Sequence, residues 1–153
     1  MPGFKAHAAG GSIVSGLVLG AAVLTGKLSP QPAPILLLFV TGVFFALFPD
    51  ADMNSVSGRI FYRTVVVADL AFLADGRYEW AAWLGFFAML PCVGRHRGWT
   101  HSIWAMFLIP LLPLSIVKHT ISETLLLPFY ITALSGYASH LVLDKMPVKK
   151  TIR

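Results

Sequence analysis

Side chains that bind divalent metal ions are rare in this sequence, and most of them occur in four short segments. Four of the five histidines and three of the seven acidic residues lie in these segments. They are His7, Asp50, Asp52, His96, His101, His140 and Asp144. Imidazole nitrogens and carboxylate oxygens without thiolate suit Zn²⁺, Mn²⁺ or Fe²⁺. These donor types favour a metal site that activates water for hydrolysis.

The spacing of these residues adds to the argument. His140 and Asp144 are four positions apart, so a helix would present both from one face. Asp50 and Asp52 can supply two oxygens from a non-helical corner, and one carboxylate can bridge two ions. Seven candidates exceed the three or four protein ligands of a single catalytic zinc. We therefore expect two or three zinc ions, with manganese or iron as the alternatives.

Two further residues are candidates for catalysis rather than for ligation alone. Arg97 lies between two of the predicted ligands and could hold a phosphate or stabilise an oxyanion through its bidentate guanidinium. The alternative for Arg97 is a contact with a lipid headgroup. Asp52 is the best candidate for a general base. The single cysteine, Cys92, excludes an internal disulfide and a thiolate metal cluster.

The composition indicates that this chain lies in a lipid bilayer. Of its 153 residues, 56% are hydrophobic and only 12% are charged, against about 25% charged residues in soluble proteins. This excludes a soluble globular domain, a disordered chain and a coiled coil. The net charge of +5 is too thinly spread to bind nucleic acid. We expect one integral-membrane domain over residues 1–153.

Six apolar runs predict an all-α, polytopic membrane bundle of about six segments, each at or below the roughly 20 residues that cross a bilayer. The third and fourth runs are short and form either a full helical pair or a re-entrant hairpin. The runs are Ala8–Thr25, Ile35–Phe48, Ile60–Ala74, Trp80–Val93, Ile103–Val117 and Leu125–Leu143.

The distribution of basic residues predicts the orientation. With six segments, nine lysines and arginines lie on the side of the N-terminus, and Lys27, Arg77 and Lys118 lie on the other. The positive-inside rule then places both termini in the cytoplasm, for a protein of the bacterial inner membrane. All seven predicted ligands fall on this cytoplasmic side.

The first run carries a stripe of small residues at every fourth position: Ala8, Ser12, Gly16 and Gly20. Such a stripe lets another helix approach closely. The partner is either another helix of the same chain or a second copy in a homo-oligomer.

The order of the polar motifs resembles one family. His7, the segments Phe48–Asp52 and His96–Ser102, and the pair His140 and Asp144 are similar to the YdjM-like bacterial inner-membrane proteins, which are described as metal-dependent hydrolases. The family is distantly similar to the zinc-dependent phospholipase C and nuclease superfamily, which binds several zinc ions through clustered His and Asp. The resemblance implies six ligands, with Asp52 as a ligand or a neighbour of one: His7, Asp50, His96, His101, His140 and Asp144.

The leading hypothesis is a membrane-embedded hydrolase that uses metal-activated water on a phosphoester, most plausibly in a lipid headgroup at the cytoplasmic interface. One alternative is a metal transporter or sensor, although a transporter needs ligands near the bilayer midplane. Another is a structural membrane protein in which the cluster ties helix ends together.

Overall fold

The structure is a computed structural model that describes residues 3–51, 55–93, 98–118 and 121–145. The described part is helical and contains no strand. Three short 3-10 turns connect its helices: η1 (Phe48–Asp50), η2 (Leu90–Cys92) and η3 (Trp99–His101). The helices are α1 (Phe4–Leu24), α2 (Pro32–Leu47), α3 (Val56–Ala74), α4 (Tyr78–Met89), α5 (Ile103–Leu108), α6 (Leu111–Val117) and α7 (Glu123–Lys145).

Within the described ranges, three helices are long and apolar enough to cross a membrane: Phe4–Leu24, Pro32–Asp50 and Glu123–Lys145. They confirm the first, second and last predicted segments by length and composition. The third run forms α3, a helix of 19 residues, and the fourth forms α4, which has 12. The fifth run is interrupted at Pro110, between α5 and α6. The bundle is therefore all-α as expected, and membrane crossing by these other runs stays a prediction.

Helices α1, α2 and α7 pack with their backbones in direct contact. A Cβ atom on Gly136 of α7 would lie 2.0 Å from the backbone oxygen of Gly42 in α2. A Cβ on Gly11 of α1 would lie 2.4 Å from the Cβ of Ala46. Small residues thus allow the close approach that holds helices together in lipid, where water no longer drives their association.

The face that α1 turns toward its neighbours differs from the predicted one. The buried positions are His7, Gly11, Ser15 and Leu19, one residue before each member of the predicted stripe. Gly16 and Gly20 are exposed, and a Cβ on either would meet no atom within 4 Å. Because His7 faces the interior, the residues at four-residue steps from it form the contact face. The expected close packing within the chain on Ala8, Ser12, Gly16 and Gly20 is therefore wrong at Gly16 and Gly20.

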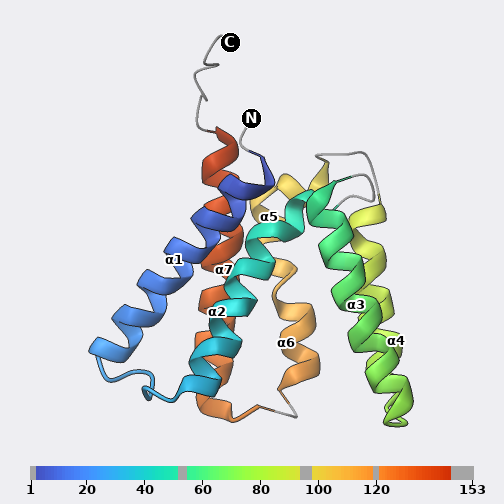
Figure 1. Ribbon diagram of the computed structural model, residues 1–153, viewed down its shortest axis with the longest axis horizontal. Coiled ribbons are helices and arrows are strands. Elements are labelled where there is room, and N and C mark those ends of the chain that lie inside the picture. The colour runs from blue at the N-terminus through green and yellow to red at the C-terminus, as the bar shows by residue number, and fades with distance from the viewer. Residues whose placement is uncertain (1–2, 52–54, 94–97, 119–120, 146–153) are drawn as a thin grey trace.

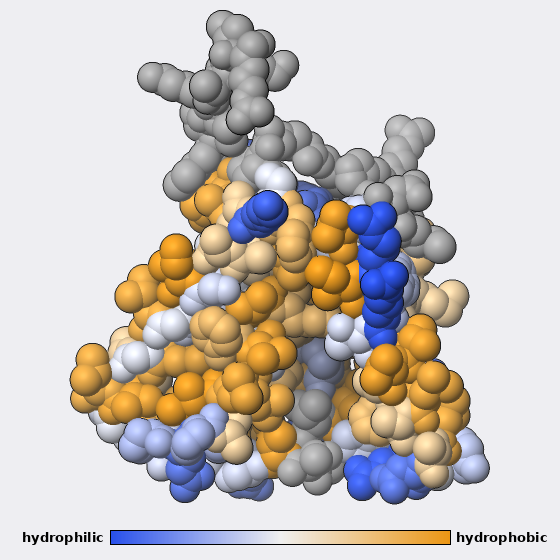
Figure 2. Space-filling model, viewed as in Figure 1, coloured by the Kyte–Doolittle hydropathy of each residue, from blue (hydrophilic) through white to orange (hydrophobic). Residues whose placement is uncertain are grey.

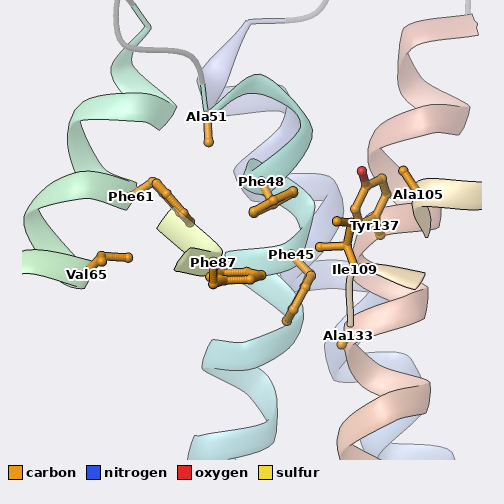
Figure 3. Packing of buried hydrophobic residues seen from close by; sticks show 10 residues of the cluster. All are labelled: Phe45, Phe48, Ala51, Phe61, Val65, Phe87, Ala105, Ile109, Ala133 and Tyr137. Atoms are coloured by element: carbon orange, nitrogen blue, oxygen red, sulfur yellow. The ribbon is translucent and has the colours of Figure 1, made fainter. Parts of the chain in front are cut away.

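An aromatic cluster joins this bundle to the hairpin of α3 and α4 (Figure 3). Phe48, which is fully buried, lies at its middle. Its ring centroid is 5.2 Å from that of Phe87, 5.5 Å from that of Phe61 and 6.0 Å from that of Tyr137. These contacts fix η1, the turn at the end of α2, between the bundle and the hairpin.

The two ends of the molecule differ (Figure 1). Helix α1 begins, and α2 and α7 end, at one end, whereas the turn between α3 and α4 lies at the other. Gly76 closes that turn with a φ of +73°, a conformation that glycine adopts without strain. Figure 2 shows a largely hydrophobic surface between the two ends. Leu17, Val67 and Trp104 are among the large hydrophobic side chains that are exposed, as expected for helices that face lipid.

Candidate metal centre

Four separate segments bring polar side chains to the end of the molecule where α1 begins. His7 lies in the first turns of α1, and Asp50 ends η1. His101 ends η3, and His140 and Asp144 lie near the end of α7. Elements far apart in the sequence thus meet at one point. We call these five residues the His/Asp cluster.

Local interactions hold the two non-helical contributors in place. Pro49 begins the tight turn that ends α2, and the backbone oxygen of Asp50 accepts a hydrogen bond from the Ser55 hydroxyl (2.5 Å). On the other side, the Ser102 hydroxyl caps α5 by accepting from the backbone N–H of Ala105 (3.1 Å). The carboxylate and the imidazole therefore project from constrained turns.

Four donor atoms of the cluster converge on one point. Asp50, His101, His140 and Asp144 each offer one atom, and these atoms lie within 4.8 Å of one another. The Nε2 atoms of His101 and His140 are 3.3 Å apart. Asp50 Oδ1 lies 3.4 and 3.7 Å from these two nitrogens, and Asp144 Oδ2 lies 3.3 and 3.5 Å from them. This group could hold a metal ion.

Hydrogen bonds on the outer side of the imidazoles determine which nitrogens face the cluster unprotonated. His140 Nδ1 lies 2.8 Å from the carbonyl oxygen of Ala46. Because a carbonyl oxygen only accepts, Nδ1 carries the proton and Nε2 of the neutral ring presents a lone pair. An outward hydrogen bond of this kind is the usual support of a metal-binding histidine.

His101 has a comparable outer contact. Its Nδ1 lies 3.3 Å from the hydroxyl of Thr100, and that hydroxyl donates to the carbonyl oxygen of Pro49 (3.3 Å). The hydroxyl therefore accepts from Nδ1–H, which leaves Nε2 of His101 with a lone pair as well. Two lone pairs and two carboxylate oxygens then face one another, an arrangement that a cation would stabilise.

The electrostatic surroundings favour the same conclusion. The side chain of His140 is fully buried, and those of Asp144, His101 and Asp50 are only 11%, 14% and 18% exposed. Among the described residues, no lysine or arginine pairs with either carboxylate. The buried atoms Asp50 Oδ1 and Asp144 Oδ1 also have no hydrogen-bond partner there. Buried polar atoms are costly without a partner, so these oxygens fit the role of ligands.

His7 lies on a second side of the cluster, next to the other oxygens of the two carboxylates. It is fully buried, and its ring stacks on that of His140, with centroids 3.9 Å apart. Its Nε2 lies 3.3 Å from Asp144 Oδ1 and 3.8 Å from Asp50 Oδ2. Each carboxylate therefore directs one oxygen toward the pair of His101 and His140 and the other oxygen toward His7.

The remaining predicted site residues cannot be placed. Asp52, His96 and Arg97 lie outside the described residues, in the segments 52–54 and 94–97. Their roles as ligands or catalytic residues stay predictions. The predicted residues that the structure does describe all lie in the His/Asp cluster.

Sequence reasoning missed the outer partners of the cluster. Thr100, whose hydroxyl contacts His101, was not among the predicted site residues. Tyr137 donates a hydrogen bond to the backbone oxygen of Thr100 and is fully buried. Tyr137 lies three residues before His140, on the same face of α7, and this spacing could have indicated that it lies beside the cluster.

Comparison with known proteins identifies the family. The model of the family described as YdjM inner membrane protein matches residues 1–151. Neither the curated proteins nor the solved structures contain a significant match to the chain. The family match covers all four polar segments on which the resemblance in sequence depends. The chain therefore belongs to the YdjM inner membrane protein family.

Proposed function

We propose that the protein is a membrane-embedded, metal-dependent hydrolase that cleaves phosphoesters, most plausibly in a lipid headgroup. The observation that carries the proposal is the convergence of four possible ligand atoms in the His/Asp cluster. Two of them are imidazole nitrogens whose outward N–H groups are engaged elsewhere. The other two are carboxylate oxygens without a basic partner among the described residues.

The spacing of these atoms supports an ion of the zinc type. Zinc bonds of about 2.0–2.1 Å place tetrahedral donors about 3.3–3.4 Å apart. The five measured separations among the four atoms range from 3.3 to 3.7 Å. Manganese and iron accept the same nitrogen and oxygen donors. The exposed Cys92 is not part of the group.

The two directions of the carboxylates support a centre of two ions. One ion would take His101, His140, Asp50 Oδ1 and Asp144 Oδ2. A second ion would be held by His7 with the other oxygens of Asp50 and Asp144, which lie 3.8 and 3.3 Å from its Nε2. Bridged ions in hydrolases lie about 3.5–4 Å apart, close enough to share one phosphoryl group. Asp52 and His96 are the further ligands that the sequence suggests for the second ion.

The chemistry follows from general properties of such centres. When bound, the ions lower the pKa of coordinated water to about 7 and polarise the phosphoryl oxygens. Asp52 would serve as the general base, and Arg97 would bind the phosphoryl oxygens of the substrate through its guanidinium. Asp50 and Asp144 would neutralise the charge of the ions, while the carbonyl of Ala46 and the hydroxyl of Thr100 orient the imidazoles.

The position of the cluster supports a substrate from the membrane. Four of its five members, all but His101, lie near one end of the described helices that are long and apolar enough to span a bilayer. A phosphate at the level of lipid headgroups would therefore lie near the cluster. The excess of basic residues that the sequence predicts for this side of the membrane supports the cytoplasmic leaflet.

A structural role is the second candidate, because the cluster joins four segments that are distant in the sequence. An ion that is fully ligated by protein would tie α1, η1, η3 and α7 together without chemistry. A transporter is less well supported, since the described ligands lie at one end of the bundle rather than at its middle.

Metal analysis of the purified full chain tests the proposal. We expect two ions of zinc or manganese per chain, both lost in His101→Ala and Asp144→Ala. We expect His7→Ala to retain one ion. Asp75→Asn, which changes an exposed acid at the opposite end of the molecule, is the control and should keep both.

Turnover separates the catalytic role from the structural one. The loaded protein should hydrolyse a phosphodiester reporter and release the headgroup of a micellar phospholipid, and both activities should be lost with the metal. Stoichiometric metal without turnover of either substrate would favour the structural role. Absence of stoichiometric metal after metal-supplemented purification would contradict both readings.

A further inference from the structure

A cleft separates the bundle of α1, α2 and α7 from the hairpin of α3 and α4. Figure 2 shows a recess on this face of the molecule, between α2 and the hairpin. Two cavities that share the side chain of Ile116 lie here. The one called the inner cavity, of about 190 Å³, lies between α2, α4, α6 and α7. The one called the outer cavity, of about 420 Å³, lies between α4 and the end of α6, toward the end of the molecule that carries the α3–α4 turn. The His/Asp cluster lies at the opposite end.

The inner cavity is apolar. Side chains of α2, α4, α6 and α7 line it, among them Phe44, Leu84, Phe87 and Ile116. The lining includes one hydroxyl, that of Thr41, which already donates a hydrogen bond to the backbone oxygen of Leu37 (2.9 Å). Among the described residues, the lining of this cavity therefore offers no free hydrogen-bond donor, which suits a hydrocarbon chain.

The outer cavity is different in character. It is lined by Glu79, Trp80, Trp83, Ser115, Ile116 and Lys118. It thus combines one acidic side chain, one basic side chain and two indole rings. Within the described part of the chain, no ion pair engages the carboxylate of Glu79 or the ammonium group of Lys118.

Ile116 lines both cavities, so the polar opening and the apolar interior are adjacent. A polar cavity beside an apolar one matches an amphiphile. Its polar group would remain in the outer cavity, while its hydrocarbon chain would lie in the inner cavity between the helices. A soluble ligand would gain nothing from the apolar part. Membrane-facing helices on both sides also place the cleft within reach of lipid.

The charges in the opening indicate the polar group. A carboxylate beside indole faces binds an ammonium group, through charge and through the cation–π interaction. An ammonium side chain nearby binds a phosphate. The ring of Trp80 is held by Phe72, whose centroid is 5.9 Å away, and by the guanidinium of Arg77 at 6.0 Å. Glu79 and Lys118 thus give the lining one charge of each sign, and the guanidinium of Arg77 adds a further positive charge beside Trp80.

We propose that this cleft binds one zwitterionic phospholipid of the phosphatidylethanolamine type. Its phosphate contacts Lys118, its ammonium group contacts Glu79 and the two tryptophans, and one acyl chain fills the apolar cavity. The bound lipid connects the hairpin to the bundle at the end away from the His/Asp cluster. This site is independent of the proposed hydrolase, since none of its residues belongs to the cluster.

Native mass spectrometry of the full chain, released from nanodiscs with equal amounts of phosphatidylethanolamine and phosphatidylglycerol, tests the proposal. We expect one retained phosphatidylethanolamine per chain. The double variant Glu79→Gln, Lys118→Gln should bind it at least about tenfold more weakly, because it loses hydrogen bonds to charged groups. The matched control Lys27→Gln, Glu123→Gln removes the same charges elsewhere and should bind as the parent does.

Filling the inner cavity tests the position of the acyl chain. Ile116→Trp should abolish retention of the lipid, and Leu84→Trp fills the same cavity from α4 in case the first variant does not fold. Metal content should stay unchanged in every variant that folds, which separates this result from the hydrolase proposal. Equal retention of phosphatidylglycerol, retention in the filled variants, or displacement by free glycerophosphoethanolamine would overturn the proposal.

Discussion

The contact between Gly42 and Gly136 makes a sharp test of the packing that supports the His/Asp cluster. In Gly136→Ala the new Cβ would lie 2.0 Å from the oxygen, 2.8 Å from the carbon and 3.1 Å from the Cα of Gly42. All three are backbone atoms, so no side chain can move aside. Cβ contacts below 3.0 Å essentially never occur. Helices α2 and α7 would therefore have to separate by at least about 1 Å at this point.

The separation would affect both stability and metal binding. Overpacking of this kind costs about 1–3 kcal/mol in the free energy of unfolding. The bond between His140 Nδ1 and the oxygen of Ala46 joins the same two helices, four residues further along each. Lengthening it from 2.8 Å by a comparable amount would break it. Loss of such an outer partner lowers metal affinity by about 10–100-fold.

The same substitution elsewhere provides the control. Gly20 lies on the exposed face of α1, and a Cβ there would meet nothing within 4 Å. Gly20→Ala should therefore leave stability unchanged or raise it by up to about 1 kcal/mol, through helix propensity. Unfolding by sodium dodecyl sulfate in mixed micelles and zinc competition with a chromophoric chelator give both quantities. If Gly136→Ala equals Gly20→Ala in both, the backbone contact and its link to His140 are refuted.

Two further substitutions test the surroundings of the cluster. Thr100→Val removes the hydroxyl behind His101 and should weaken zinc binding by about 10–100-fold. Thr100→Ser keeps the hydroxyl and should bind zinc as the parent does. Equal zinc affinity of the two variants in the chelator assay would exclude a role of the hydroxyl in positioning His101. Phe48→Ala should lower the free energy of unfolding by about 3–5 kcal/mol, because it empties the middle of the aromatic cluster, and Phe48→Leu should lower it less. A loss below 1 kcal/mol for Phe48→Ala in the detergent titration would contradict this packing.

The sequence predicted the long apolar helices and the meeting of five polar residues well. Placing charged and imidazole side chains in a bilayer costs free energy. Because the chain has few of them, their positions indicated where a functional site lies. Pro110 divides the fifth run, because proline lacks the N–H that continues a helix. Pro110 could have indicated this break, but the continuous apolar run favoured a single segment.

The contact face of α1 was harder to predict. A helix surrounded by lipid on one side and protein on the other is apolar all round, so hydrophobic periodicity does not separate the two faces. His7 was the better guide, since a buried imidazole fixes the orientation of the helix that carries it. The supports of the imidazoles could not be predicted, because the carbonyl of Ala46 and the hydroxyl of Thr100 reach the histidines only through tertiary packing.

The His/Asp cluster draws its members from the first helix of the chain and from the last turns of the final one. During synthesis, His7 enters the membrane long before Asp144 has left the ribosome. A nascent or truncated chain that lacks α7 keeps two of the five members out of reach of the others. For the metal centre proposed above, binding of the ion would then occur only after α7 has joined the bundle, and a chain that lacks α7 would not form the site.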